Sequence, residues 1–119
     1  MTKAMVLMMH AFLLAALLAS SHGVLKWVSV QPHEDYFELL LAQWKYILLA
    51  LTIYGVVFFY YILVLRSSPI SSLYPIYTGL SVLAVMLVGR IVFSETISLV
   101  HGIGAALVLS GIMVIGWNS

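Results

Sequence analysis

The stretch PISSLYPIYTGLS, Pro69 to Ser81, places prolines, tyrosines, serines, a threonine and a glycine in an otherwise apolar chain. The chain has 119 residues, of which 64% are hydrophobic and only 8% are charged. A soluble domain carries about a quarter charged residues, so this chain does not cover a water-facing surface. We therefore expect a membrane protein in which this polar stretch has a specific use.

Four apolar runs are long enough for transmembrane helices, which need about 20 residues each. They cover residues 4–25, 39–65, 71–89 and 98–117, and the segments between them hold most of the charges. Short connections make consecutive helices antiparallel neighbours. The sequence thus predicts an all-α, multi-pass membrane protein with one four-helix transmembrane domain, residues 1–119, and both termini on the same side of the bilayer.

Several classes of protein are excluded by composition. The chain has no cysteine, which removes disulfides and thiol chemistry, and no basic block that would bind nucleic acid. No serine–histidine–acid set has a supporting spacing, and the adjacent residues His33, Glu34 and Asp35 do not form a coherent metal site. Glu95 lies beside the start of the fourth helix, where a carboxylate suits the helix dipole. We expect no enzyme, no metal and no cofactor.

Two features of the topology stay open. Lys3, the apolar run after it and the segment LLASS are also typical of a signal peptide, although the run is long for one. Cytoplasmic loops carry the excess of Lys and Arg, but the charges here give no clear bias. One side has Lys3 and Arg66, and the other has Lys26, Lys45 and Arg90. Either orientation, or both, is compatible with this distribution.

A polar stripe follows one face of the third helix. Its members, spaced at i, i+3, i+4 and i+7, are Tyr74, Tyr77, Thr78 and Ser81. Pro75 removes a backbone donor and bends the helix, and Gly79 leaves space for close approach. The stripe is either the wall of a substrate pathway or a contact between helices, since hydroxyl and small residues also pack membrane helices together.

The first helix carries two ionisable residues one turn apart, His22 and Lys26. Such groups are costly at membrane depth and often mark functional sites. His22 is either a neutral side chain bonded to a neighbouring helix or a proton-linked or phosphate-binding group. Taken alone, Lys26 is better explained by a side chain that extends to the lipid headgroups.

The second and fourth helices carry repeated residues on single faces. In the second helix, Tyr54, Phe58 and Tyr61 share a face, which we interpret as packing and an aromatic belt. In the fourth helix, Gly104 and Gly111 are a heptad apart. Small residues placed in this way let another helix come close, so we predict that they form a packing contact.

The whole pattern resembles the small multidrug resistance proteins of the drug/metabolite transporter (EamA-like) superfamily. The motifs that carry the resemblance are YPIYTG, FSETIS and GIGAALVLSGIMVIG. The resemblance implies a dimer, often antiparallel, in which two four-helix chains enclose one pathway. It places Tyr74 and Tyr77 in the binding chamber and Gly79 at the bend of the third helix. It also places Gly104 and Gly111 in the dimer contact.

One departure from this family selects a branch. The drug exporters need a membrane-embedded glutamate in the first helix, and the corresponding position here, counted back from Lys26, is Leu18. No acidic residue lies in residues 4–25, and His22 offers no negative charge to a cationic drug. The paired subunits that flip aminoarabinose-linked undecaprenyl phosphate also lack this glutamate, and they resemble the chain in the run SPISSLYPIYTGLS.

The resemblance therefore implies a transporter or flippase subunit of the bacterial inner membrane that moves an amphiphilic, lipid-linked sugar or another phosphate-bearing substrate. Lys26, Arg66 or Arg90 would hold the phosphate, and the tyrosines would meet the sugar. The expected partners are the lipid bilayer and a second four-span chain, in a homodimer or a hetero-pair. A drug or metabolite exporter of the same fold and a non-transporting subunit of a larger complex are the alternatives.

Overall fold

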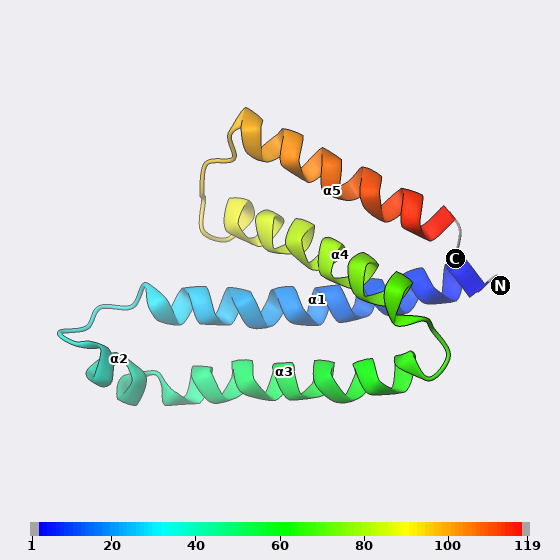
Figure 1. The fold of residues 1–119 in the computed structure, drawn as a ribbon. Coiled ribbons are helices and arrows are strands. Elements are labelled where there is room, and N and C mark those ends of the chain that lie inside the picture. The colour runs from blue at the N-terminus through cyan, green and yellow to red at the C-terminus, as the bar shows by residue number, and fades with distance from the viewer. Residues whose placement is uncertain (1–2, 118–119) are drawn as a thin grey trace.

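The computed structural model describes residues 3–117, and all of its regular structure is helical (Figure 1). The helices are α1 (Lys3–Ser29), α2 (Tyr36–Ala42), α3 (Trp44–Leu65), α4 (Ile70–Ile91) and α5 (Leu99–Trp117). All except α2 are long and apolar enough to cross a membrane. The predicted all-α class with four long apolar helices is confirmed.

The helix α1 lies between α3 and α4 and packs against both, while α5 packs on α4 (Figure 1). The prediction that consecutive helices are neighbours is therefore wrong for α3 and α4, because a short turn joins them but each packs mainly on α1, which lies between them. The physical reason lies in the buried face of α1, which is narrow because it carries Ala11, Ala15 and Ala19. Small residues allow helices on both sides to approach closely.

Side-chain hydrogen bonds join α1 to α3, and two of them are short. The buried Ser21 Oγ donates to the carbonyl oxygen of Ala50 at 3.0 Å. Nearer the start of α1, His10 Nδ1 and the Tyr60 hydroxyl are 2.8 Å apart, with their rings in an edge-to-face arrangement. Polar side chains between apolar helices are satisfied across the interface in this way, and both bonds stabilise the α1–α3 pair.

The short helix α2 divides the second apolar run, which was expected from residue 39. Asp35 caps α2, because its side chain accepts a hydrogen bond of 2.7 Å from the Glu38 N–H. The helix ends at Ala42, and α3 begins at Trp44. The long helix therefore starts several residues later than the hydrophobicity indicated, because a capped turn precedes it.

Gly79 is where α4 and α5 approach each other. A Cβ at this position would come within 2.7 Å of the Ile112 Cδ1 atom, and Ile112 is the buried residue of α5. The helix α4 is continuous from Ile70 to Ile91 with Pro75 inside it. In this chain Gly79 therefore accommodates a side chain of the next helix.

The predicted location of both termini on one side concerns residues 1–2 and 118–119, which lie outside the described residues. The first part of α1 and the last turn of α5 lie at the same end of the molecule (Figure 1). A Cβ at Gly116 would be 3.8 Å from the Met8 Sδ atom, which places these two segments side by side.

Candidate functional site

A groove runs along α1, with α4 as one wall and α3 as the other wall at its wider end. Three cavities lie along it, with volumes of about 560, 400 and 230 Å³. Leu18 lines the first and the second cavity, and His22 lines the second and the third. The cavities are therefore consecutive parts of one groove, which we call the α1 groove.

The widest part of the α1 groove is lined by tyrosines from both walls. The ring centroid of Tyr61 on α3 lies 5.5 Å from that of Tyr77 and 6.4 Å from that of Tyr74, both on α4. Tyr77 is 8% exposed, whereas Tyr74 is 53% exposed. The Tyr61 hydroxyl is buried and has no hydrogen-bond partner among the described residues. An unpaired buried hydroxyl is unfavourable, so a hydrogen bond from a polar ligand that reaches this group would stabilise the complex.

The middle of the α1 groove is less polar than the stripe on α4 indicated. Thr78 Oγ1 donates to the carbonyl oxygen of Tyr74 at 2.6 Å, and Ser81 Oγ donates to that of Tyr77 at 2.8 Å. Both hydroxyls therefore bond to carbonyl groups of their own helix, one turn earlier. Leu18 adds an apolar side chain, so this part of the groove is suited to an apolar segment of a ligand.

His22 lies at the junction of the middle and the last cavity. The Tyr54 hydroxyl is 3.4 Å from each of its ring nitrogens, and the two rings meet edge to face. His22 is exposed in the chain, and it lines both cavities. The histidine thus has a neighbour on another helix and an open side toward the groove.

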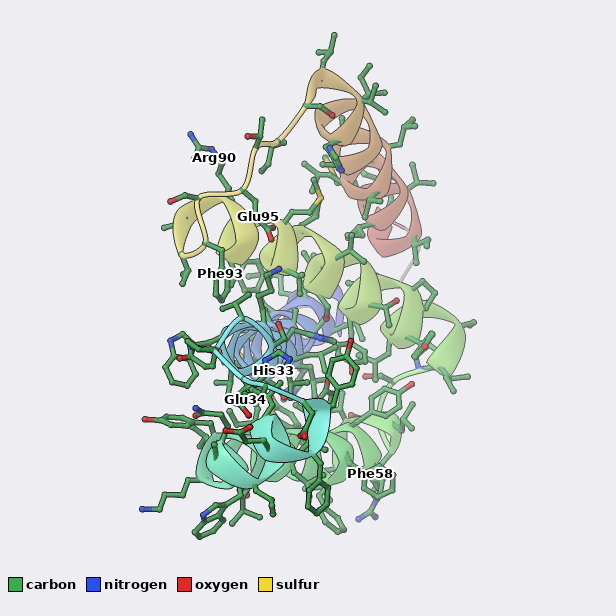
Figure 2. All side chains as sticks on the ribbon, turned by 90° about the vertical axis from the view of Figure 1, so that its left-hand side faces the viewer. His33, Glu34, Phe58, Arg90, Phe93 and Glu95 are labelled. Atoms are coloured by element: carbon green, nitrogen blue, oxygen red, sulfur yellow. The ribbon has the colours of Figure 1, made fainter. Side chains whose placement is uncertain are left out.

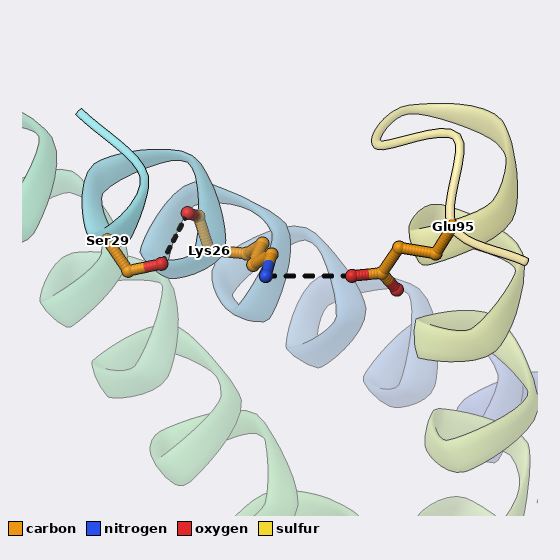
Figure 3. A network of polar contacts seen from close by, with 3 residues as sticks. All are labelled: Lys26, Ser29 and Glu95. Atoms are coloured by element: carbon orange, nitrogen blue, oxygen red, sulfur yellow. Dashed lines mark hydrogen bonds and ion pairs between the residues drawn. The ribbon is translucent and has the colours of Figure 1, made fainter. Parts of the chain in front are cut away.

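The last cavity carries an ion pair. Lys26 Nζ lies 3.6 Å from Glu95 Oε2, and the two side chains are 46% and 51% exposed (Figure 3). Both residues line the cavity of about 230 Å³. Glu95, which the sequence placed beside the start of the fourth helix, thus contacts Lys26 of α1, and its interaction with the helix dipole stays a prediction.

The three cations considered for a phosphate have different positions. Lys26 lines the α1 groove. Arg90 points away from α1 (Figure 2). Arg66 caps the C-terminal end of α3, and Lys26 is in the last turn of α1. These two helix ends lie at opposite ends of the molecule (Figure 1). Within residues 3–117, no three His, Cys, Asp or Glu side chains lie close enough together to hold a metal ion.

The structure brings the candidate pathway residues together along one groove. They are Tyr74, Tyr77, Thr78, Ser81, His22 and Lys26. Three further residues of the groove, which share one face of α3 and were interpreted as packing residues, are Tyr54, Phe58 and Tyr61. Glu95 also lines the groove, and the sequence pattern did not indicate this because its position depends on how the loop after α4 folds.

Gly104 and Gly111 lie away from this groove, on the exposed part of α5. A Cβ at either position would meet no atom of another element within 4 Å among the described residues. Most of α5 is exposed, and Ile112 is its one buried side chain among the described residues. Their predicted role in a dimer contact stays a prediction.

The groove is formed by α1, α3, α4 and the loop after α4, in a chain with four helices that are long and apolar enough to cross a membrane. Together with a relative that is a flippase subunit, these features define a small multi-pass membrane transporter of the small multidrug resistance-like type, rather than an enzyme. The chain belongs to the family of the flippase subunit ArnE. It is 32% identical over 73 residues to the probable 4-amino-4-deoxy-L-arabinose-phosphoundecaprenol flippase subunit ArnE of Enterobacter sp. (strain 638). The match covers 61% of this chain and 67% of the relative. No family model and no solved structure matches the chain.

Proposed function

We propose that this protein is a subunit of a flippase that moves a lipid-linked, phosphate-bearing sugar across the bacterial inner membrane. The observation that carries the proposal is the order of surfaces along the α1 groove. A tyrosine cluster with an unpaired hydroxyl lies at one end, an apolar segment in the middle, and Lys26 at the other end. The name of the ArnE relative describes a substrate of matching chemistry, a sugar joined through phosphate to a polyprenol.

Lys26 is the residue to which we assign the phosphate. An ammonium group near the headgroup level attracts an anionic lipid, and hydrogen bonds between charged partners are stronger than neutral ones. His22 lines the same cavity and supplies a second polar group. Arg66 and Arg90 are also positively charged, but neither lines the described part of this groove.

The tyrosines are assigned to the sugar. Aromatic rings offer an apolar face, and the Tyr61 hydroxyl offers an unused hydrogen bond. Leu18 lies beside this cluster and is two turns of α1 before Lys26, which is about 12 Å along the helix. A sugar is much closer than this to the phosphate that it carries. The two ends of the groove therefore act in succession, as the headgroup moves along α1.

Leu18 supports an anionic substrate over a cationic drug. It lines both the tyrosine cavity and the middle cavity, where a carboxylate would face the ligand directly. A leucine at this position neither attracts a cation nor repels a phosphate. The groove thus has its cation at one end and an uncharged path through the middle.

A second four-span chain completes the pathway in this proposal. Tyr74 and His22 are exposed although they line the groove, and α5 presents Gly104 and Gly111 on its open face. The relative is itself described as a subunit. We assign the open side of the groove and the glycine face of α5 to contacts with that chain, which is either a second copy or a similar protein.

The test is a comparison of substrates in proteoliposomes. Purified protein, alone and together with a candidate four-span partner, is given either a fluorescent polyprenyl-phosphate sugar or a fluorescent lipophilic cation. We expect flipping of the phosphate-linked sugar and no transport of the cation. Transport of the cation alone would show a drug exporter, and transport of neither by any combination would show a non-transporting subunit.

A further inference from the structure

Glu95 contacts the ammonium group that the proposed function assigns to the phosphate. Its Oε2 atom lies 3.6 Å from Lys26 Nζ, and both side chains line the cavity at the end of the α1 groove (Figure 3). Any anion that binds Lys26 inside this cavity therefore meets a carboxylate of the same chain at the same position.

The loop after α4 is built to place this carboxylate. Ser94 has a φ of 54°, in the left-handed region that residues other than glycine seldom adopt. The next N–H, that of Glu95, donates to the carbonyl oxygen of Gly89 at 3.0 Å. Gly89 is buried, and a Cβ there would overlap the Glu95 Oε1 atom. The turn at Ser94 and the absence of a side chain at Gly89 together let the Glu95 carboxylate pack against α4.

Lys26 is not the cation nearest to Glu95 in sequence. Arg90 is closer along the chain, but it points away from α1, whereas Glu95 points toward it (Figure 2). The pairing with Lys26 therefore results from the fold of the loop and not from local sequence. His22, which lines the same cavity, is the other titratable side chain close to the pair.

The ion pair is well suited to exchange. About half of each side chain is exposed, and ion pairs in such positions contribute little to stability. A phosphate group brings several strong acceptor oxygens to the same cation. Replacement of the carboxylate by a phosphate is therefore favourable without a large loss of folding free energy.

We propose that Glu95 is an internal counter-ion of Lys26, which an anionic lipid headgroup must displace to bind in the α1 groove. The inference rests on the proposed function, since the displacing group is the phosphate of the lipid-linked substrate. Displacement of the carboxylate requires only that the Glu95 side chain turns away from Lys26 within the cavity that both residues line.

The experiment measures binding of farnesyl phosphate to the full chain in nanodiscs of neutral lipid. Glu95→Gln removes the competing charge, and Gly89→Ala displaces the carboxylate while the charge is kept. We expect each variant to bind farnesyl phosphate about fivefold more tightly, the factor that corresponds to ~1 kcal/mol. Glu34→Gln is the matched control, because it removes a carboxylate from the loop before α2 at the same end of the molecule, and its affinity stays at the wild-type value.

Lys26 must be required for this gain. In a double-mutant cycle, the Lys26→Gln, Glu95→Gln variant binds no more tightly than Lys26→Gln alone. Farnesol controls for the lipid tail, and inorganic phosphate competes for the site only weakly because it lacks that tail. A response to inorganic phosphate without any response to farnesyl phosphate would overturn the assignment to a lipid headgroup.

Failure of this inference differs from failure of the proposed function. If binding depends on Lys26 but is equal in the Glu95→Gln and Glu34→Gln variants, the internal counter-ion is wrong while the phosphate site stands. If Glu95→Gln tightens binding as expected and yet no lipid-linked sugar is flipped, the counter-ion stands and the proposed transport function is wrong.

Discussion

Tyr61 of α3 and Tyr77 of α4 face each other across the α1 groove, with ring centroids 5.5 Å apart. The helix α1 lies between α3 and α4, so these rings connect the two walls of the groove at its widest part. The Tyr61 hydroxyl, although buried, is not hydrogen-bonded to any described residue. A substitution that removes this hydroxyl can therefore affect ligand binding without lowering the stability of the protein.

Tyr61→Phe should leave the melting temperature unchanged or slightly higher, because it removes a buried hydroxyl without a partner. Flipping of a lipid-linked sugar should fall, since the same hydroxyl is assigned to the ligand. The matched control is the adjacent Tyr60→Phe, which removes the 2.8 Å contact with His10. This control should cost about 1 kcal/mol of stability. Loss of stability in Tyr61→Phe, with transport intact, would mean that Tyr61 only packs.

Gly79→Ala should destabilise the contact between α4 and α5, because the added Cβ meets the Ile112 side chain at 2.7 Å. Overpacking of this kind costs about 1–3 kcal/mol. Ile112→Ala in the same chain should recover part of that loss, which a double-mutant cycle of unfolding free energies in detergent measures.

Gly102→Ala is the control for Gly79→Ala, since a Cβ at Gly102 meets no other element within 4 Å among the described residues. It should leave stability unchanged or raise it slightly, because alanine favours a helix more than glycine does. Equal stability of the two variants would show that the close approach at Gly79 does not constrain α5.

Association through α5 is tested by the double variant Gly104→Leu, Gly111→Leu. We expect weaker cross-linking to a second chain at unchanged expression, because leucine side chains keep the partner helix at a distance. Gly102→Leu is the matched control: it is nine residues from Gly111, on the opposite side of the helix. Equal cross-linking of the double variant and this control would remove the glycine face from the interface.

Leu18→Glu tests which branch of the transporters the groove belongs to. A carboxylate at this position faces two cavities and should strongly reduce flipping of a phosphate-linked lipid by repulsion. Leu18→Gln adds similar bulk and polarity without charge, so it should retain more activity. Tolerance of the glutamate together with new export of cations would favour the drug-exporter alternative.

The long apolar helices were predictable because the length and hydrophobicity of each run are those of a transmembrane helix. The packing order of these helices was harder to predict from the sequence. Short connections suggest neighbours, yet α1 separates α3 from α4, and this depends on the alanine-rich face of α1 fitting between them. The periodicity of one helix identifies its apolar face, but it does not specify which other helix packs against that face.

The site shows the same limit. Spacing grouped Tyr74 and Tyr77 correctly on one face, but it treated Thr78 and Ser81 as polar wall residues, whereas their hydroxyls bond to their own helix. Tyr61 has the spacing of a packing residue and becomes part of the groove only through the position of α4. Glu95 reaches Lys26 because Ser94 adopts a left-handed backbone conformation and because Gly89 has no side chain that would overlap the carboxylate. A pattern of residue types indicates neither feature.

The central claim, that the α1 groove is the path of a phosphate-linked sugar, is tested most directly by flipping of a fluorescent polyprenyl-phosphate sugar by the Tyr74→Ala, Tyr77→Ala variant in proteoliposomes. Tyr36→Ala, which alters an exposed tyrosine of α2 outside the groove, is the control. The melting temperature is followed in parallel. We expect the double variant to lose flipping while it remains folded and the control to keep it. Full flipping by the double variant would contradict the claim.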